Sequence, residues 1–492
     1  MKKLLTISLF FLSLTLSAAT YYVRTGGNNA AAGTSDATAW ADLTKVNSTT
    51  FSAGDSILFR RGDTFRGSVY QTENGTAADW IYYGAYGTGA KPLILGSKDL
   101  SATSAWTNHS GNVWKTTATL GTTQGDISNL IFNNEASCGY KKRTLDSLNA
   151  QGKFFYNTAD NLVYIYSVGN PGTFYSHIEA AGHHDVYQAV LYFINCSYIH
   201  IADLDVRYSS ADGIEGRNVT GFIVERCDVS YIGGEWFLDA PDTRRVGNGI
   251  QLSVNVNNAI VRYNRAHQCY DAGISPQAWG TGAVMQNIWI YNNIVTNCWY
   301  SYETWAEPTF TLSNVHFYNN TCYNAGVCWS NSALQRPDRN NAAHVMVWAL
   351  TGIVSNVTVR NNIFDESTNF AMRLDDNVSK IVVDYNIIDC DTIGYTAETT
   401  KYTTLTAWRA ALSQDAHSIS ADPLFVDTDD FHIPANSPAK DKGIAVGATD
   451  DFYGTPRGYL PDMGAYEVED IRVALVNGRA VVINGSLQTI RK

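Results

Sequence analysis

Short β-rich runs with asparagine at comparable places recur through the middle of this chain and restrict its fold more than any other feature. Five of them are RYNRAHQC (262–269), IYNNIVTNC (290–298), FYNNTCYN (317–324), VRNNIFDE (359–366) and VDYNIIDC (383–390). Two earlier runs, IADLDV (201–206) and ERCDVS (225–230), fit the same slot. The spacings between successive members are 24, 37, 29, 27, 42 and 24 residues, for Asp203, Cys227, Asn264, Asn293, Asn320, Asn362 and Asn386. A unit of about two dozen residues with variable insertions indicates a β-solenoid.

The chemistry of asparagine agrees with this prediction. Asparagine tolerates the left-handed backbone of a sharp turn, and its side-chain amide can bond to an asparagine in the next coil. Strands rich in Val, Ile and Tyr flank each asparagine. A coil of this kind buries its apolar face only by stacking on its neighbours, so we expect an all-β chain built from stacked coils.

A second pattern recurs in ADGIEGR (211–217), GNGIQLS (247–253), DAGISPQ (271–277) and YSYETWA (300–306). Alternation along a strand points its apolar members inward and the residues that follow them outward. The inward members are Ile214, Ile250, Ile274 and Tyr302, and the outward ones are Glu215, Gln251, Ser275 and Glu303. Two residues on, Arg217, Ser253, Gln277 and Trp305 also point outward, and Arg373 joins them in a later coil. Coils are ~4.8 Å apart, so these side chains form the floor of a groove suited to an extended polymer.

Two long insertions locate the walls of that groove. One is GGEWFLDAPDTRRV (233–246), and the other covers about 325–342, ahead of the strand HVMVWAL (344–350). Both follow the asparagine turn and precede the strand of the second pattern. We therefore expect them to rise from one edge of the solenoid, three coils apart.

Several segments resemble a known family. TYYVRTGGNN (20–29) and FSAGDSILFRRGDTFRG (51–67) resemble its N-terminal cap, WIYYGAYGTGAKPLILG (80–96) its first coils, and ADPLFVD (421–427) with PDMGAYE (461–467) its closing coils. The chain thus resembles the bacterial right-handed parallel β-helix proteins of the pectate-lyase-like superfamily. The resemblance implies the fold. It specifies function weakly, because the superfamily includes lyases, glycoside hydrolases, epimerases and adhesins.

The expected organisation follows from these assignments. Residues 1–19 have a basic start, an apolar stretch and small residues before the cleavage point, which is the layout of a secretory signal peptide. Residues 20–98 form the N-terminal cap and first coils, 99–187 an inserted β-rich subdomain, 188–467 the coils and closing cap, and 468–492 a C-terminal extension. We expect a secreted monomer with no transmembrane segment.

Composition excludes some partners and favours others. Charged residues make up 16% of the chain and the net charge is −11, which argues against nucleic acid as a partner. The 29 Tyr and 12 Trp residues favour a polysaccharide, because sugar rings stack on exposed aromatic faces. The eight cysteines lack metal-binding spacing, and Cys269 and Cys298 share a slot in successive coils, as a buried pair or a disulfide. No cofactor is predicted, although a lyase would admit Ca²⁺; the acidic run DTDDF (427–431) fits solvated turns better.

Glu303 is the first candidate for acid or base catalysis. It lies centrally between the insertions beside Trp305, where loss of water raises the pKa of a carboxyl group as a general acid requires. Glycoside hydrolysis needs a second carboxylate at ~5 Å or ~6.5–9.5 Å. Glu215 is three coils away, ~14 Å at the coil spacing, and Asp271 fits only if its turn curls back. Four loop acids are the other candidates: Glu235, Asp239, Asp242 and Asp338.

A uronate lyase is the alternative. No lysine occurs between Lys153 and Lys380, which excludes a lysine base in the central groove. Arginines on the insertions offer carboxylate binding, namely Arg244, Arg245, Arg336 and Arg339. The candidate bases are His267, His344 and Tyr270. The predicted substrate-binding residues are Arg244, Arg245, Gln251, Gln277, Trp305, Tyr270, His344 and Arg336.

The sequence therefore predicts a secreted enzyme that cleaves a polysaccharide in the groove. Glycoside hydrolysis is favoured by the outward acids and the absence of lysine, with Glu303, Asp271 and Glu215 as catalytic candidates. A uronate lyase is the first alternative, and a non-catalytic glycan-binding solenoid is the second.

Overall fold

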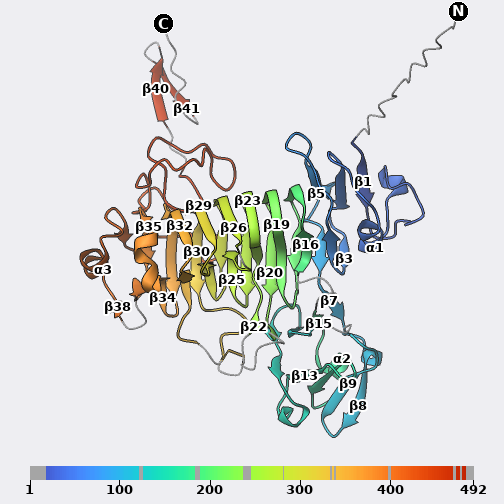
Figure 1. Ribbon diagram of the computed structural model, residues 1–492. Coiled ribbons are helices and arrows are strands. Elements are labelled where there is room, and N and C mark those ends of the chain that lie inside the picture. Colours follow the sequence, from blue (N-terminus) through green and yellow to red (C-terminus); the bar gives the residue numbers. More distant parts are fainter. Residues whose placement is uncertain are drawn as a thin grey trace, which may run out of the picture.

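A computed structural model describes residues 18–120, 126–182, 189–236, 245–280, 282–332, 335–336, 339–396, 400–468, 472–476 and 479–483. The chain winds into a right-handed parallel β-helix whose coils stack along one axis, with a smaller body hanging from one side (Figure 1). The all-β solenoid predicted from the repeats is confirmed.

Each coil contributes strands to three faces. The first face contains β1 (Thr20–Val23), β2 (Ser56–Arg60), β5 (Ile81–Tyr86), β17 (Ser197–Ala202), β26 (Val284–Tyr291), β29 (Thr311–Tyr318), β32 (Ile353–Arg360) and β35 (Ile381–Asp384). The second contains β4 (Val69–Gln71), β16 (Ala189–Ile194), β25 (Ala272–Ala278), β28 (Tyr300–Ala306), β31 (Ala343–Leu350), β34 (Phe370–Arg373) and β37 (Gly394–Thr396). Two long strands, β19 (Asp212–Glu225) and β23 (Ile250–Arg262), run through both faces and join them into one sheet.

The third face is a separate parallel sheet. It contains β3 (Thr64–Arg66), β6 (Leu93–Leu95), β18 (Asp205–Arg207), β20 (Asp228–Ile232), β24 (Arg265–Cys269), β27 (Ile294–Thr296), β30 (Thr321–Ala325), β33 (Ile363–Ser367), β36 (Ile387–Asp389) and β39 (Ile419–Ser420). Short helices α1 (Leu43–Asn47) and α3 (Leu405–Leu412) lie at the two ends of the solenoid, where the coils would otherwise expose their apolar interior (Figure 1).

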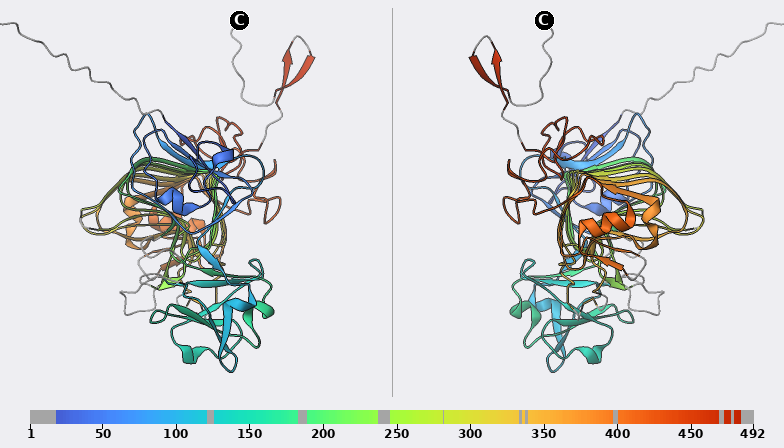
Figure 2. Two further views of the ribbon diagram at one scale, coloured as in Figure 1. Left: turned by 90° about the vertical axis from the view of Figure 1, so that its right-hand side faces the viewer. Right: turned by 90° about the vertical axis from the view of Figure 1, so that its left-hand side faces the viewer.

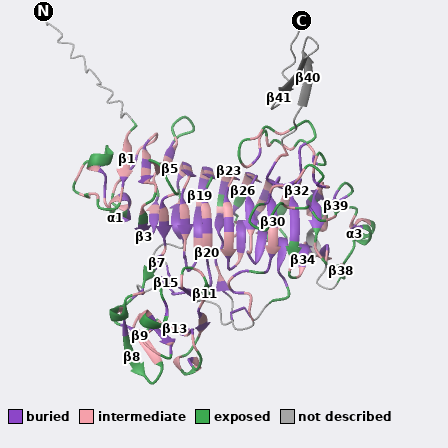
Figure 3. Ribbon diagram, turned by 180° about the vertical axis from the view of Figure 1, so that it is seen from behind, coloured by how far each residue is buried: buried purple, intermediate pink, exposed green. Residues whose placement is uncertain are grey.

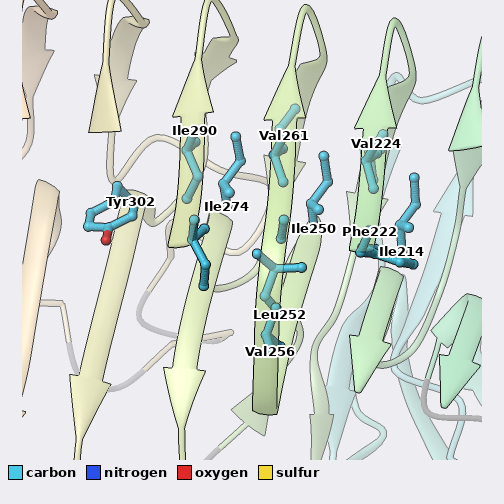
Figure 4. Packing of buried hydrophobic residues seen from close by; sticks show 14 of the residues in the cluster. Ile214, Phe222, Val224, Ile250, Leu252, Val256, Val261, Ile274, Ile290 and Tyr302 are labelled. Carbon is cyan, nitrogen blue, oxygen red and sulfur yellow. The ribbon is translucent and has the colours of Figure 1, made fainter. Parts of the chain in front are cut away.

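The interior is a set of stacked apolar columns. Ile214 pairs with Ile250, Ile250 with Ile274, and Ile274 with Tyr302, so the predicted inward column is confirmed (Figure 4). Each of these side chains is at most 1% exposed. Full burial of such a side chain contributes roughly 1.5–3 kcal/mol, which makes the columns the main source of stability. Figure 3 shows the same buried band along the whole solenoid.

The asparagine ladder forms at the corner between the first and third faces. The Asn264 backbone and side-chain N–H groups both donate to Asn293 Oδ1 at 3.0 Å, and the same pattern continues through Asn320, Asn362 and Asn386. The ladder asparagines are buried. Their amides therefore satisfy donors that the turn would otherwise leave without partners.

Two details differ from the expectation. The left-handed residue is the one before each ladder asparagine, with φ between 52° and 58° at Tyr263, Asn292, Asn319, Asn361 and Tyr385. The left-handed backbone conformation and the ladder of side-chain amide hydrogen bonds are thus provided by two successive residues. In the earliest coil, pairing of β18 with β20 aligns Leu204 with Cys227, so Asp203 belongs to the left-handed position and not to the ladder.

The inserted subdomain forms two small sheets below the solenoid (Figures 1 and 2). One sheet contains β7 (Ser97–Asp99), β10 (Asn129–Phe132), β11 (Ser137–Cys138) and β15 (Ile178–Ala181). The other contains β8 (Trp106–Ser110), β9 (Val113–Thr116), β12 (Tyr140–Lys142), β13 (Lys153–Asn157) and β14 (Leu162–Tyr166), and a short helix, α2 (Pro171–Phe174), follows. A separate apolar core holds this subdomain together, with Leu130, Phe154 and Ile165 at its centre.

The remaining elements are hairpins: β21 (Glu235–Trp236) with β22 (Arg245–Val246), β38 (Thr400–Tyr402) against β37, and β40 (Arg472–Val476) with β41 (Arg479–Ile483). All eight cysteines are free, so Cys269 and Cys298 are a buried thiol pair and not a disulfide. Within the described ranges, no helix has the length and apolar character needed to cross a bilayer. The predicted signal peptide lies almost entirely outside these ranges.

Candidate functional site

The outward column of the second face is a continuous row of polar side chains. Glu215 pairs with Gln251, and Gln251 with Ser275, in register on β19, β23 and β25. Ser275 then donates to the backbone carbonyl of Glu303 on β28 at 3.2 Å. All four side chains are at most 5% exposed. The floor column (Glu215, Gln251, Ser275 and Glu303) is thus covered by other parts of the chain.

Glu303 is held by three donors. Trp348 Nε1 donates to Oε1 at 2.5 Å, while Gln277 Nε2 and Ser275 Oγ donate to Oε2 at 2.8 and 3.3 Å. Burial, together with the negative charge of Asp271, raises the pKa of Glu303 to about 8 despite these hydrogen bonds. Glu303 is therefore a protonated carboxyl group at neutral pH, which is the state that a general acid needs.

Asp271 lies in the turn that leads into β25, one coil before Glu303. Its backbone N–H donates to the Gly247 carbonyl at 3.1 Å, and its side chain is partly exposed. Burial raises the pKa of Asp271 to about 6, and the nearby charge of Arg336 opposes that rise. The negative charge of Asp271 contributes to the raised pKa of Glu303, so the two carboxyl groups lie within electrostatic reach of one another. Their pKa values are pushed apart, which is typical of an acid and its partner.

A second pair of carboxyl groups lies two coils before Asp271. Glu215 Oε1 accepts from Ser253 Oγ at 2.6 Å, whereas Oε2 is buried with no hydrogen-bond partner among the described residues. Asp212 accepts from the Asn248 backbone N–H at 2.6 Å. Burial raises the pKa of both groups, and the charges of Glu215 and Asp271 raise that of Asp212 further. Asp212 was missed from the sequence, although its place in ADGIEGR, two residues before the inward isoleucine, is a signal.

The floor is flanked by an arginine between aromatic rings. The Arg336 guanidinium lies 4.0 Å from the ring centre of Tyr270 and 4.2 Å from that of Trp299, and it donates to the Tyr270 carbonyl. Its Nε has no hydrogen-bond partner in the described part of the chain, and the same holds for Nε1 of Trp305 and Trp329. Such unsatisfied buried donors cost free energy until a ligand binds them.

The two insertions and the subdomain meet beside this floor. Arg245 Nη1 donates to Gln335 O and Oε1 at 2.9 and 3.2 Å, Nη2 donates to Ser128 O at 3.0 Å, and Nε donates to Gly234 O. Its side chain is 6% exposed. Arg245 therefore ties both insertions to the subdomain, and the expectation that it binds substrate gives way to an anchoring position.

A buried ion pair strengthens the same junction. Lys141 of the subdomain pairs with Asp126, and Asp126 also accepts from the Trp236 backbone N–H at 3.0 Å. Burial lowers the pKa of Lys141 to about 8. Arg143 stacks over the Trp236 ring at 3.8 Å. These contacts fix the subdomain to the first insertion.

Two candidate bases are not on the floor. His344 is fully buried, its ring nitrogens bond to Ser301 Oγ and to the Glu366 carbonyl, and burial lowers its pKa to about 3. Its ring stacks on Phe364 of the solenoid interior. Strand alternation fails here, since the next coil places both Ala371 and Met372 in the core. His267 lies on β24 of the third face and bonds to Thr296.

The other candidates are distributed as follows. Gln251 donates to Gln277 Oε1 at 3.3 Å and accepts from Asn248 at 2.6 Å, so both glutamines belong to the floor network. Arg244 and the loop acids Asp239, Asp242 and Asp338 lie outside the described residues. Glu235 is described, and its charge contributes to the raised pKa of Asp212. Among the described side chains, no three His, Cys, Asp or Glu residues gather into a metal-binding group.

Comparison with solved structures shows a shared fold at low sequence identity. A structure described as the complex of XylC with xylose matches with a TM-score of 0.50 and 14% identity, over 76% of this chain and 66% of that chain. A structure described as a glycoside hydrolase matches with a TM-score of 0.50 and 9% identity, over 77% of this chain and 95% of that chain. No protein-family model and no curated protein matches this sequence.

Proposed function

We propose that this protein is a secreted enzyme that hydrolyses glycosidic bonds of a polysaccharide, with Glu303 as general acid and Asp271 as its partner carboxylate. The observation that carries the proposal is the electrostatic interaction of these two groups in successive coils. It accompanies pKa values of about 8 for Glu303 and about 6 for Asp271. Between these values one group holds a proton while the other is ionised, which is the state that glycoside hydrolysis requires.

Each residue has a defined task in the reaction. Glu303 donates its proton to the departing glycosidic oxygen, so the leaving sugar departs as a neutral alcohol. Asp271 acts at the anomeric carbon, either as the nucleophile or by removing a proton from an attacking water. Gln277, Ser275 and Trp348 fix the orientation of the Glu303 carboxyl group. The configuration of the released anomer distinguishes the two roles of Asp271.

The charge of the site favours a neutral glycan. Four carboxyl groups, those of Asp212, Glu215, Asp271 and Glu303, lie along the floor, and the charge of each acts on, or is acted on by, at least one of the others. A uronate would bring a further negative charge to them, and its binding would have to overcome that repulsion. A lyase also needs cations that neutralise the uronate carboxylate. Two of the arginines considered for that task are buried in other contacts, namely Arg245 and Arg336.

Two further observations support a carbohydrate ligand for this site. Glu215 Oε2 and Trp305 Nε1 are buried without partners among the described residues, and sugar hydroxyl groups can both donate to and accept from such atoms. The similar structures also support the proposal, because one is described with bound xylose and the other as a glycoside hydrolase.

The decisive experiment is a panel of neutral and acidic polysaccharides, assayed for new reducing ends and for ultraviolet absorbance. Hydrolysis produces reducing ends without absorbance, whereas elimination leaves a conjugated double bond that absorbs. Glu303→Gln should abolish the release of reducing ends while Glu307→Gln, a nearby control on the same coil, should not. Products that absorb in the ultraviolet would show that the enzyme is a lyase and not a hydrolase. A panel in which nothing is cut would contradict the enzyme proposal.

Export is part of the proposal and rests on residues 1–19. Expression of the full chain in a bacterial host should yield mature protein outside the cytoplasm, with an N-terminus near Ala19. Retention of full-length protein in the cytoplasm would contradict it.

A further inference from the structure

A cavity of about 370 Å³ lies in the closing segment of the chain, between residues 432 and 468. Its wall includes His432, Tyr453 and Tyr466, together with polar side chains of Asp451, Thr455 and Glu467. The volume is within the range of about 300–1,000 Å³ in which proteins bind small ligands. We call it the cap cavity.

Three aromatic rings in this wall are stacked. The His432 ring lies 3.9 Å from Tyr466 with an angle of 15° between planes, and 5.7 Å from Tyr453 with an angle of 13°. The rings of Tyr453 and Tyr466 are 5.5 Å apart at 28°. The three rings therefore form one stacked aromatic cluster in the wall of the cavity, and a ring-shaped ligand can add to this cluster where a ring face is exposed.

Hydrogen bonds from Arg265 and to Asp451 hold the stacked rings in place. Arg265 of β24 donates to Tyr466 Oη at 3.1 Å and to Tyr453 Oη at 3.3 Å, and its guanidinium lies 4.8 Å from the Phe452 ring. Asp451 accepts from the backbone N–H groups of Tyr453 and Thr455 at 2.9 and 2.7 Å. The rings are thus preorganised, which reduces the entropy lost on binding.

One ring of this stack is exposed to solvent. Tyr453 is 65% exposed, although Tyr466 beside it is 3% exposed. Tyr453 accepts a hydrogen bond from Arg265 and contacts His432 and Tyr466, yet most of its surface stays open to solvent. Its negatively polarised face attracts the C–H groups on one side of a pyranose ring. Two polar atoms of the cavity wall can form hydrogen bonds with sugar hydroxyl groups: Thr455 Oγ1 and Nε2 of His432. The other ring nitrogen of His432, Nδ1, bonds to Asp430.

The cap cavity is separate from the carboxylate floor. The closing segment packs on the third face, since the Ala465 backbone donates to Thr321 of β30 at 2.9 Å. The floor belongs to the second face, on β19, β23, β25 and β28. The views along the solenoid axis place the closing segment away from the inserted subdomain, which borders the floor (Figure 2).

We infer that the cap cavity is a second carbohydrate-binding site, which binds pyranose rings of a glycan on the Tyr453–His432–Tyr466 stack and takes no part in catalysis. The choice of a glycan rests on the proposed function, whereas binding itself does not depend on any bond being cut. Two sites on one rigid solenoid increase the apparent affinity for a long polymer, because the second contact forms at high effective concentration.

The test is affinity electrophoresis of the full chain carrying Glu303→Gln, in gels that contain xylan, galactan, glucomannan or polygalacturonate. At least one neutral polymer should retard the protein. Adding Tyr453→Ala should weaken that retardation at least five-fold, while Tyr453→Phe, which keeps the ring, should preserve it. Tyr459→Ala is the matched control, because Tyr459 is 94% exposed on the same segment. Unchanged melting temperatures would show that the variants fold.

Retardation that is equal for Tyr453→Ala and Tyr459→Ala would overturn the inference, and so would the absence of retardation in every gel. Cleavage by the unmutated enzyme is measured separately. Loss of cleavage would count against the proposed function alone, whereas loss of the Tyr453 effect would count against the cap cavity alone. With Glu303 intact, the Tyr453→Ala variant should cleave short, soluble oligosaccharides at the same rate as the unmutated enzyme.

Discussion

Trp348 donates its indole N–H to Glu303 Oε1, although the two residues are 45 positions apart and lie on neighbouring coils. This hydrogen bond is one of three that stabilise the ionised form of a carboxyl group whose burial favours the neutral form. The balance between burial and these donors therefore sets the pH range in which Glu303 holds its proton.

Replacement of Trp348 tests that balance. Trp348→Phe removes a donor that lowers the pKa of Glu303, so the pKa should rise above about 8. The alkaline limb of the pH–activity profile should then move to higher pH by several tenths of a unit or more. A variant with lower activity but an unmoved alkaline limb would show that Trp348 acts through packing only.

The activity of the unmutated enzyme should follow a bell-shaped pH profile. Asp271 must be ionised, so kcat/KM should fall as the pH drops below about 6, and Glu303 must be protonated, so it should fall above about 8. Because the two groups interact, the limbs report the pair. A profile that stays flat from pH 4 to pH 9 would contradict this assignment.

Glu303→Gln should reduce kcat by about 10²–10⁴-fold, the usual contribution of a general acid. A substrate with a good leaving group, such as an aryl glycoside, needs less protonation and should lose less activity. Glu307→Gln should retain the parent rate with both substrates. A similar loss with both substrates would indicate that Glu303 has a role other than proton donation.

The same substitution should change how stability depends on pH. The folded protein keeps the Glu303 proton up to about pH 8, whereas the unfolded chain loses it near the ordinary carboxyl value. The folded state thus binds more protons in this interval, and stability falls as the pH rises through it, by at most about 1.4 kcal/mol for each pH unit. Glutamine does not titrate, so the Glu303→Gln variant does not lose stability in this way. The difference between its melting temperature and that of the parent should therefore shift in favour of the variant as the pH rises from 5 to 8. Parallel melting curves would contradict the raised pKa.

The asparagine ladder should be the sensitive part of the scaffold. Asn320→Ala removes an acceptor from Asn293 and leaves the carbonyls of Ile290 and Tyr318 without their donor. These groups are buried, so the free energy of unfolding should fall by about 2–4 kcal/mol. Asn356→Gly, which removes an exposed amide bonded to Asn314 and tolerates the left-handed backbone at this position (φ 52°), is the control and should cost under about 0.5 kcal/mol. Denaturant unfolding of both variants measures the difference.

The stacked columns follow from the sequence because a solenoid repeats its local rules. The inward position of Ile250 and the outward position of Gln251 depend on strand alternation and on pairing with the next coil, and both are visible as a repeated pattern. The same rule places Glu303 on the floor. It fails near the start of β31, where Val345 lies in the core and the adjacent His344 ring stacks on Phe364 of the same interior.

The catalytic pairing depends on contacts that no local pattern contains. The charge of Asp271, in the turn before β25, acts on Glu303 in the next coil, and the charges of Glu215 and Asp271 act on Asp212. The guanidinium group of Arg245 is suited to binding a substrate carboxylate, yet the path of the insertions buries this side chain against Gln335 and Ser128. A turn conformation and a loop path are decided by the sum of many distant contacts.

The sequence by itself determined the frame: an all-β solenoid, its asparagine ladder and the column in which Glu303 stands. Those features rest on hydrogen bonding and apolar burial between adjacent repeats, and each repeat carries the information for its own coil. Only the tertiary structure decided that Trp348 covers Glu303 and that Asp271 shares its surroundings. The reason is physical: a pKa depends on how much water and which charges surround a group, and distant parts of the chain supply both.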